Sequence, residues 1–121
     1  MTESVHVPAG VDSPVVLINA FSVPLSQADR FLSRWKDNAR FMAAADGFIR
    51  ARMCQAISDR AELTFVNVAE WVSGTALDAA RTNPEWLASV RRLQEDPELD
   101  VTARPMVYQV VVDAAPGDPL D

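Results

Sequence analysis

The chain has 121 residues, of which 49% are hydrophobic and 23% are charged, and its formal net charge is −6. This length is enough for one domain with its own core, and the composition is that of a folded rather than a disordered chain. The negative charge disfavours nucleic acid as a partner, because phosphate binding needs a basic face. No segment has the length of a membrane span or the pattern of an export signal, so we expect a cytoplasmic protein.

The sequence contains one histidine, His6, and one cysteine, Cys54. A lone cysteine cannot form an internal disulfide, and this pair of residues offers no spacing typical of a metal site. We therefore expect no bound metal. Because no histidine lies near Cys54 in the sequence, this thiol is expected to be buried and structural rather than nucleophilic.

The first half of the chain contains a strand followed by a helix. Residues 14–23 are rich in β-branched and aromatic side chains and end at Pro24, which predicts a strand. From Ala28 to Met42 apolar residues recur at helical spacing, until Asp46 and Gly47 interrupt the pattern.

The second half contains a hairpin, a broken helix and a last strand. Residues 48–58 and 63–72 flank a polar turn and predict two paired strands. Ser73 is a candidate cap for a short helix ending at Arg81, and Asn83 with the following proline and glutamate is typical of a second helix start. A polar link that includes Pro105 leads to residues 106–113, which predict the final strand.

The resulting order, β-α-β-β-α-β, is the ferredoxin-like plan of an α+β protein, with an antiparallel sheet that carries its helices on one face. We expect this domain to occupy residues 14–113, with loosely ordered tails at residues 1–13 and 114–121. Internal repeats are absent.

Apolar residues occupy consecutive positions in residues 15–18 and again in residues 106–112, apart from Gln109. In a sheet with one solvated face these positions would alternate with polar ones. The pattern predicts that both faces are buried and that a second copy of the chain covers the face without helices, which makes a dimeric α+β barrel. A hydrophobic sheet with a partly solvated face is the alternative.

Two asparagines are predicted among large apolar side chains. Strand alternation places Asn19 on the same face as Leu17 and Phe21, and it places Asn67 on the same face as Trp71. A buried amide without hydrogen bonds costs about 1–3 kcal/mol for each unpaired group, so such residues have either a structural or a functional role. The spacing alone favours a structural role.

Three segments carry a resemblance to a known family. Residues 17–24, 46–48 and 65–71 have the sequences LINAFSVP, DGF and FVNVAEW. In this order and spacing they resemble the antibiotic biosynthesis monooxygenase superfamily. The resemblance spans nearly the whole predicted domain and implies a small homodimeric α+β barrel, in agreement with the two apolar faces of the sheet.

Two enzymatic branches of that superfamily are relevant. The branch of anthrone oxygenases uses an asparagine on the first strand and an asparagine and a tryptophan four residues apart on the third, which Asn19, Asn67 and Trp71 match. This implies a monooxygenase that oxidises a polycyclic aromatic polyketide, of the anthrone or naphthacenone type, to a quinone with O₂ and without a cofactor. The branch that degrades heme adds an iron-binding histidine on the last helix. That position falls near Val90, and His6 lies far from it, so heme degradation is disfavoured.

Further side chains are candidates to line the pocket. Some quinone-forming relatives place an arginine or a tyrosine there, and the matching positions are Val90 and Leu77, while the neighbouring Arg91 is expected to point elsewhere. Apolar candidates for substrate contact are Phe31, Trp35, Met53, Phe65 and Trp86, each of which also fits a purely structural place in the core.

Arg50 and Arg52 alternate on one strand, as in a solvated or interfacial stripe, and we assign them no function.

The alternative function, from a different class, is a dimeric protein without catalytic activity that binds a small hydrophobic ligand in the same pocket.

Overall fold

The computed structural model describes residues 11–121. The elements, in chain order, are strand β1 (Val15–Ser22), a 3-10 helix η1 (Leu25–Gln27), helix α1 (Ala28–Ala43), strands β2 (Phe48–Gln55) and β3 (Phe65–Trp71), helices α2 (Gly74–Ala80) and α3 (Pro84–Gln94), and strand β4 (Thr102–Tyr108). None of the described helices combines the length and the apolar character that a membrane span requires.

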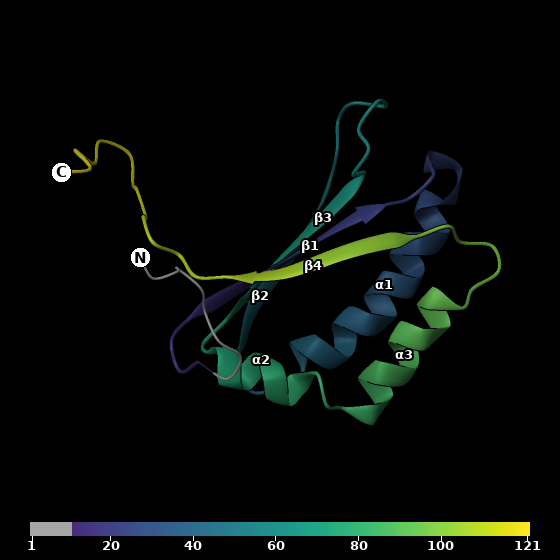
Figure 1. The fold of residues 1–121 in the computed structure, drawn as a ribbon, viewed down its shortest axis with the longest axis horizontal. Coiled ribbons are helices and arrows are strands. Elements are labelled where there is room, and N and C mark those ends of the chain that lie inside the picture. Colours follow the sequence, from purple (N-terminus) through teal and green to yellow (C-terminus); the bar gives the residue numbers. More distant parts are fainter. Residues whose placement is uncertain (1–10) are drawn as a thin grey trace, which may run out of the picture.

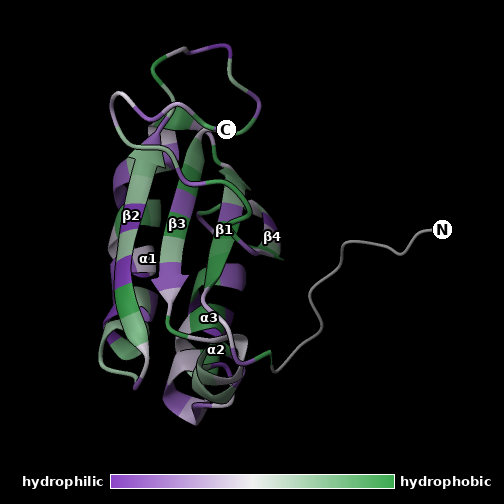
Figure 2. Ribbon diagram, turned by 90° about the vertical axis from the view of Figure 1, so that its left-hand side faces the viewer, coloured by the Kyte–Doolittle hydropathy of each residue, from purple (hydrophilic) through white to green (hydrophobic). Residues whose placement is uncertain are grey.

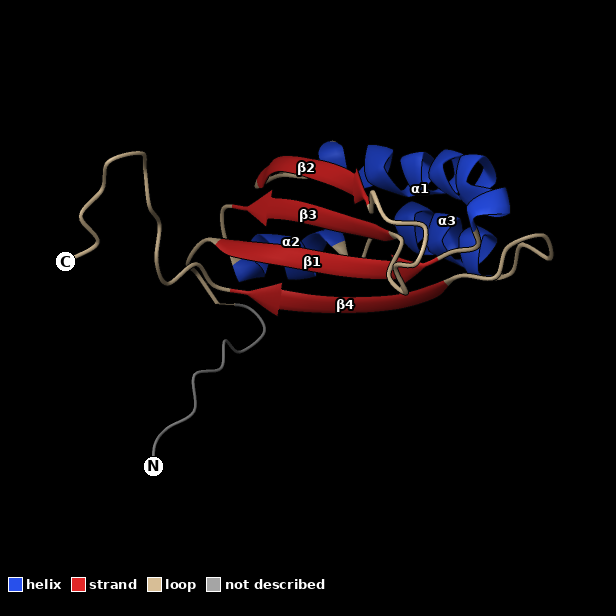
Figure 3. Ribbon diagram, turned by 90° about the horizontal axis from the view of Figure 1, so that it is seen from above, coloured by secondary structure: helices blue, strands red, loops and turns tan. Residues whose placement is uncertain are grey.

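The four strands form one sheet in the order β2-β3-β1-β4, and all neighbouring strands run antiparallel. Helices α1, α2 and α3 lie on one side of this sheet, and no helix of residues 11–121 lies on the other side (Figures 1 and 3). This arrangement confirms the predicted ferredoxin-like α+β fold, including the break between the second and third helices.

Local capping explains where the two short helices begin. The Ser73 hydroxyl accepts a hydrogen bond from the Ala76 N–H at 3.0 Å, and the Asn83 side-chain oxygen accepts one from the Glu85 N–H at 2.8 Å. These bonds pair backbone donors that the first helical turn leaves without partners. Both predicted helix starts are therefore confirmed.

Gly47 connects α1 to β2 in a conformation that requires glycine. Its φ is +87°, and a Cβ at this position would lie 2.5 Å from the Cβ of Ala76. The absence of a side chain therefore permits both the left-handed backbone and the close approach of α2. The Gly47 carbonyl accepts a hydrogen bond from the Val72 N–H at 2.8 Å, which ties this turn to the end of β3.

The prediction for the last strand was wrong in its position. The strand covers Thr102–Tyr108 rather than residues 106–113, and Val110, Val111 and Val112 follow it with exposed fractions of 61–78%. Pro105 belongs to β4 rather than to a polar link, and it lies opposite Asn19. A proline is tolerated there because β4 is an edge strand, whose outer side needs no hydrogen-bond donor.

The hairpin was predicted correctly, although both of its strands are shorter than expected. Its first strand, β2, ends at Gln55, and its second strand, β3, begins at Phe65.

The prediction that Cys54 is buried was wrong, because this thiol is exposed. Strand alternation explains the error: Met53 and Cys54 face opposite sides of the sheet, and Cys54 faces the side without helices.

The side of the sheet without helices, which we call the open face, is turned towards the viewer in Figure 2. Its side chains along β1, β3 and β4 are largely apolar. Across these strands the pairing register aligns the side chains that share this face. Arg50 of β2 forms an ion pair with Glu70 of β3 at 2.6 Å on the same face. The apolar members are Val16, Ile18, Val66, Val68, Met106 and Tyr108.

Two ion pairs that share one buried carboxylate join α1 to the segment after α3. The carboxylate of Asp96 is buried and accepts hydrogen bonds from Arg30 at 2.8 Å and from Arg34 at 3.0 Å. The hydrogen bond from Arg30, opposed by burial, holds the pKa of Asp96 well below its usual range. These contacts fix the spacing of α1 and α3 over the sheet.

Thr64, directly before β3, fixes the alignment of β3 with β1. Its hydroxyl accepts a hydrogen bond from the Val23 N–H at 2.9 Å and lies 3.1 Å from the Val23 carbonyl oxygen, while its N–H donates to the Phe21 carbonyl at 2.8 Å. The residue is 8% exposed, so water does not readily replace these bonds.

We predict that Thr64→Val lowers the free energy of unfolding by about 1–3 kcal/mol, because the buried Val23 N–H loses its partner. Urea unfolding of the variant measures this change. Thr102→Val, at an exposed position of β4, is the matched control and should change the free energy by less than about 0.5 kcal/mol. Equal effects of the two substitutions would show that Thr64 does not have this role.

Candidate active site

A cavity of about 790 Å³ lies between the helix-covered side of the sheet and the helices. Most of its lining is apolar, and its size is in the range of pockets that hold small organic ligands. The hydrophobic core is divided into two clusters, one around Phe21, Phe31 and Phe65 and the other around Val15, Trp71 and Leu77. Residues of both clusters line the cavity, which thus interrupts the core.

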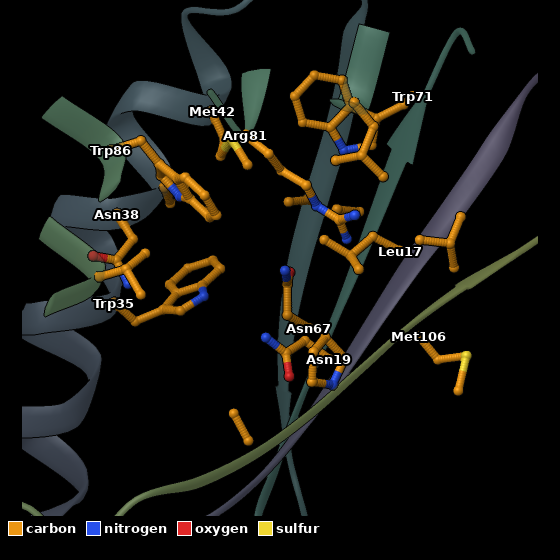
Figure 4. A pocket seen from close by; sticks show the side chains of 18 of the residues that line it. Leu17, Asn19, Trp35, Asn38, Met42, Asn67, Trp71, Arg81, Trp86 and Met106 are labelled. Atoms are coloured by element: carbon orange, nitrogen blue, oxygen red, sulfur yellow. The ribbon is translucent and has the colours of Figure 1, made fainter. Parts of the chain in front are cut away.

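Asn19 and Asn67 form the polar centre of the sheet wall. They face each other directly in the pairing of β1 with β3, and both line the cavity (Figure 4). Asn67 is 8% exposed. The amide group of an asparagine can present either its oxygen or its NH₂ to a ligand after rotation of its terminal torsion angle.

Trp71 lies two residues further along the same face from Ala69 and is 1% exposed. Its ring packs against Phe48 in a T-shaped arrangement, with ring centroids 5.4 Å apart and an interplanar angle of 84°. Such edge-to-face contacts restrict the orientation of the ring. Phe48 therefore holds the indole in place at the cavity wall.

The buried side-chain nitrogen and oxygen atoms without a hydrogen-bond partner in residues 11–121 all belong to residues that line this cavity. They are the side-chain oxygens of Asn19, Asn38 and Asn67 and the indole N–H of Trp71. Each such group costs about 1–3 kcal/mol when it stays unpaired. Four of them around one apolar cavity form a set of hydrogen-bonding positions for a ligand with polar atoms or for water.

The opposite wall comes from α1 and α3. Trp35 of α1 and Trp86 of α3 present their indole rings to the cavity across from the two sheet asparagines (Figure 4). Asn38 lies beside them and was missed in the sequence. Its spacing, three residues after Trp35 and four before Met42, places it on the same helix face and was the available signal.

The structure brings together most, but not all, of the residues predicted for the pocket. Trp35, Leu77, Trp86 and Val90 line the cavity with the three predicted catalytic residues. Arg91 is exposed and is not part of the lining, as expected.

Phe31, Phe65 and Met53 do not belong to the lining. The ring of Phe31 is fully buried between Phe21 and Phe65, at centroid distances of 5.0 and 5.1 Å, and Met53 packs against the same cluster. At this end of the sheet the three aromatic rings pack against one another. These three side chains are core residues.

The lining offers poor ligands for heme iron or for another metal. Among the described residues around the cavity there is no histidine, cysteine or tyrosine. The one histidine of the sequence, His6, lies outside the described residues. Within residues 11–121 no cluster of His, Cys, Asp and Glu is arranged to hold a metal ion. The residues present therefore do not fit a heme with axial histidine ligation.

The family model for antibiotic biosynthesis monooxygenase matches residues 14–92, which include β1, α1, the hairpin and most of α3. The chain belongs to this family. A comparison with curated proteins gave no match.

Solved structures of other proteins share the fold. A Shewanella loihica protein described as a candidate monooxygenase is 28% identical, with a TM-score of 0.66 over 86% of this chain and 100% of the other. SnoaB, a cofactor-independent oxygenase from Streptomyces nogalater, is 24% identical, with a TM-score of 0.69 over 84% and 96% of the two chains.

MhuD, solved with two manganese protoporphyrin IX molecules per active site, is 24% identical, with a TM-score of 0.64 over 84% and 98% of the chains. At this level of identity, SnoaB and MhuD support the fold alone. This fold thus occurs in a cofactor-independent oxygenase and in a protein that holds porphyrins.

We predict that a hemin titration shows no tight, stoichiometric complex with the absorbance spectrum of axial histidine ligation, because the cavity lining contains no imidazole. Absorbance spectroscopy at micromolar protein tests this. The variant His6→Ala is the control for ligation by the histidine outside the described residues. A histidine-type spectrum that disappears in this variant would show that His6 reaches the iron, and the prediction would be wrong.

Proposed function

We propose that the protein is a cofactor-independent monooxygenase that oxidises a polycyclic aromatic ketone of the anthrone or naphthacenone type to a quinone with O₂. The observation that carries this proposal is the set of unpaired polar atoms of Asn19, Asn67 and Trp71 in an otherwise apolar cavity between aromatic walls. Membership of a monooxygenase family supports it, as does the occurrence of the same fold in SnoaB, a cofactor-independent oxygenase.

The chemistry needs little from the protein, because the substrate supplies the electrons. The methylene group of an anthrone lies between two aromatic rings and opposite a ring carbonyl, so loss of a proton gives an electron-rich enolate. The carbon of this anion bonds to O₂, and its electrons reduce the O₂ to a carbon-bound peroxide anion. After the peroxide has taken up a proton, loss of water converts the carbon into a second carbonyl. One oxygen atom of O₂ enters the quinone and the other leaves as water.

The side chains around the cavity match the requirements of these steps. After rotation of the terminal torsion angle, the side-chain NH₂ groups of Asn19 and Asn67 can donate hydrogen bonds to the ring oxygen, on which negative charge develops, and donors held there stabilise this charge. The indole N–H of Trp71 is available to the peroxide. The rings of Trp35 and Trp86 provide flat apolar surfaces for an aromatic substrate.

The direct test is incubation of the purified protein with an anthrone in air, without added flavin, metal or NADPH. The proposal requires O₂ uptake and a new quinone absorbance above the rate of spontaneous oxidation. Saturable binding of the ligand without turnover would instead favour the alternative function of a non-catalytic binding protein.

We predict that Trp71→Phe lowers turnover by more than about 10-fold, which corresponds to a loss of about 1.4 kcal/mol of transition-state stabilisation. Phenylalanine keeps the ring contact with Phe48 but removes the N–H, so ligand affinity and melting temperature should stay close to those of the original protein. Steady-state kinetics, ligand titration and thermal unfolding measure the three quantities.

The matched control for Trp71→Phe is Phe48→Leu, which weakens the ring contact and retains the N–H. It should lower stability more than Trp71→Phe lowers it and should reduce turnover less. If Trp71→Phe reduces turnover only as far as it reduces stability, Trp71 is a core residue without a part in the reaction.

We also propose that two copies of the chain pack through their open faces. The apolar side chains that β1, β3 and β4 present on this face, among them the exposed Met106 and Tyr108 of β4, are unusual for a solvated sheet. Among the described residues no helix covers them (Figure 2).

Sedimentation at micromolar concentration is expected to show a homodimer, with an interface of at least about 1,200 Å². Ile18→Glu places a charge at the centre of the open face and should produce monomers, while Asp12→Lys, at an exposed position outside the sheet, should not. A monomer of the original sequence under these conditions would rule out this arrangement.

A further inference from the structure

A single cationic group reaches the cavity among the described residues. The charged side chains in the lining are Arg81 and Asp78, and both come from α2 and its C-terminal cap. In Figure 4 the side chain of Arg81 extends from the rim into the cavity, towards the part where Trp71, Leu17 and Asn67 lie. The position at which the family resemblance indicates a pocket arginine, Val90, lies on a different helix.

The charge of Arg81 is poorly balanced by the protein. Within the described residues its ionic partner is Asp78, whose carboxylate oxygen lies 3.9 Å from the guanidinium nitrogen, too far for a hydrogen bond. By comparison, Arg30 and Asp96 approach to 2.8 Å, and Arg50 and Glu70 to 2.6 Å. The side chain of Arg81 is only 35% exposed, so water reaches it incompletely.

A guanidinium that faces an apolar cavity is stabilised by an anionic oxygen, which it binds with short, charge-assisted hydrogen bonds. The overall charge of −6 disfavours the approach of anions, so any affinity for them has to come from this local group. The neighbouring asparagine amides add neutral donors. Together they form a site for a negatively charged oxygen on a flat, apolar ligand.

We propose that Arg81 binds an oxyanion carried directly by the aromatic ring system of the ligand, a phenolate or an enolate, and thereby favours the ionised form of the bound ligand. The ligand class rests on the proposed function, but the binding of the anion does not require any reaction with O₂. Arg81 is then the residue that makes a weak carbon or phenol acid ionise in the cavity at neutral pH. Asp78 weakens this effect, because its negative charge lies beside the guanidinium.

The test is a spectrophotometric titration of a hydroxyanthraquinone bound to the protein, since its ionisation changes its colour and the molecule is already a quinone. With the original sequence, the pKa of the bound hydroxyl is expected to fall by about 1–3 units relative to the free probe, as an opposite charge within a few ångströms produces. Arg81→Gln should remove most of this shift and reduce the affinity for the ionised probe by about 10-fold or more. Arg81→Lys, which retains the charge, should keep part of the shift.

Two matched controls separate this effect from a general change of charge. Arg91→Gln removes an exposed arginine of α3 outside the cavity and should leave the pKa of the bound probe unchanged. Asp78→Asn should lower that pKa further. Thermal unfolding of each variant shows whether it is folded, and the opposite shifts expected for Asp78→Asn and Arg81→Lys remain measurable if Arg81→Gln does not fold.

A second probe, an anthraquinone carboxylate without a hydroxyl group, identifies the source of the negative charge. If Arg81→Gln weakens binding of this probe but leaves the pKa of the hydroxyanthraquinone unchanged, Arg81 recognises a peripheral acid and the proposal is wrong. The proposal is also wrong if Arg81→Gln leaves the pKa of the bound hydroxyanthraquinone unchanged while Asp78→Asn weakens the affinity for the ionised form of this probe. If the protein takes up no O₂ with an anthrone but still lowers the pKa of the bound hydroxyanthraquinone through Arg81, the oxygenase function is wrong and the oxyanion site remains supported.

Discussion

The site depends first of all on the register of β1 against β3. In this register Asn19 and Asn67 are direct partners, and Trp71 pairs with Val15 on the same face. Because side chains alternate along a strand, a slip of β1 against β3 by one residue would place Asn19 on the opposite face of the sheet from Asn67 and Trp71. The hydrogen bonds around Thr64 and the continuous run of apolar partners fix the pairing that places all three groups against the helices.

A second constraint is the separation of the helices from the sheet. At one end the rings of Phe21, Phe31 and Phe65 pack together between helix and sheet. Further along the sheet the smaller side chains of Ala51 and Ala69 leave room for the cavity. The ion pairs of Asp96 with two arginines of α1 hold the far wall in place. Side-chain packing is therefore incomplete in the centre of the protein. A cavity of this kind lowers the stability of the fold unless a ligand or water fills it.

Much of this arrangement could be predicted from the sequence, because it depends on local patterns. Alternation within residues 14–23 placed Asn19 among apolar side chains, alternation within residues 63–72 placed Asn67 on the same face as Trp71, and the family resemblance implied that the three share one pocket. Capping residues identified both short helices. The length of the last strand could not be read from apolar character, since Val110–Val112 are as apolar as the strand itself but lack a partner strand in the described structure. Likewise Arg81 lies at the end of a short helix, where the direction of its side chain depends on how α2 packs against β3.

The order of the strands also has a consequence for synthesis of the protein. Of the four described strands, β1 is made first and β4 last, yet β1 lies inside the sheet between β3 and β4. Until β4 has been made and has left the ribosome, β1 can pair with β3 along one edge, but its other edge has no partner among the described strands. During that interval the nascent chain exposes an unpaired apolar strand of the kind that promotes aggregation, and such a strand is a natural binding site for chaperones.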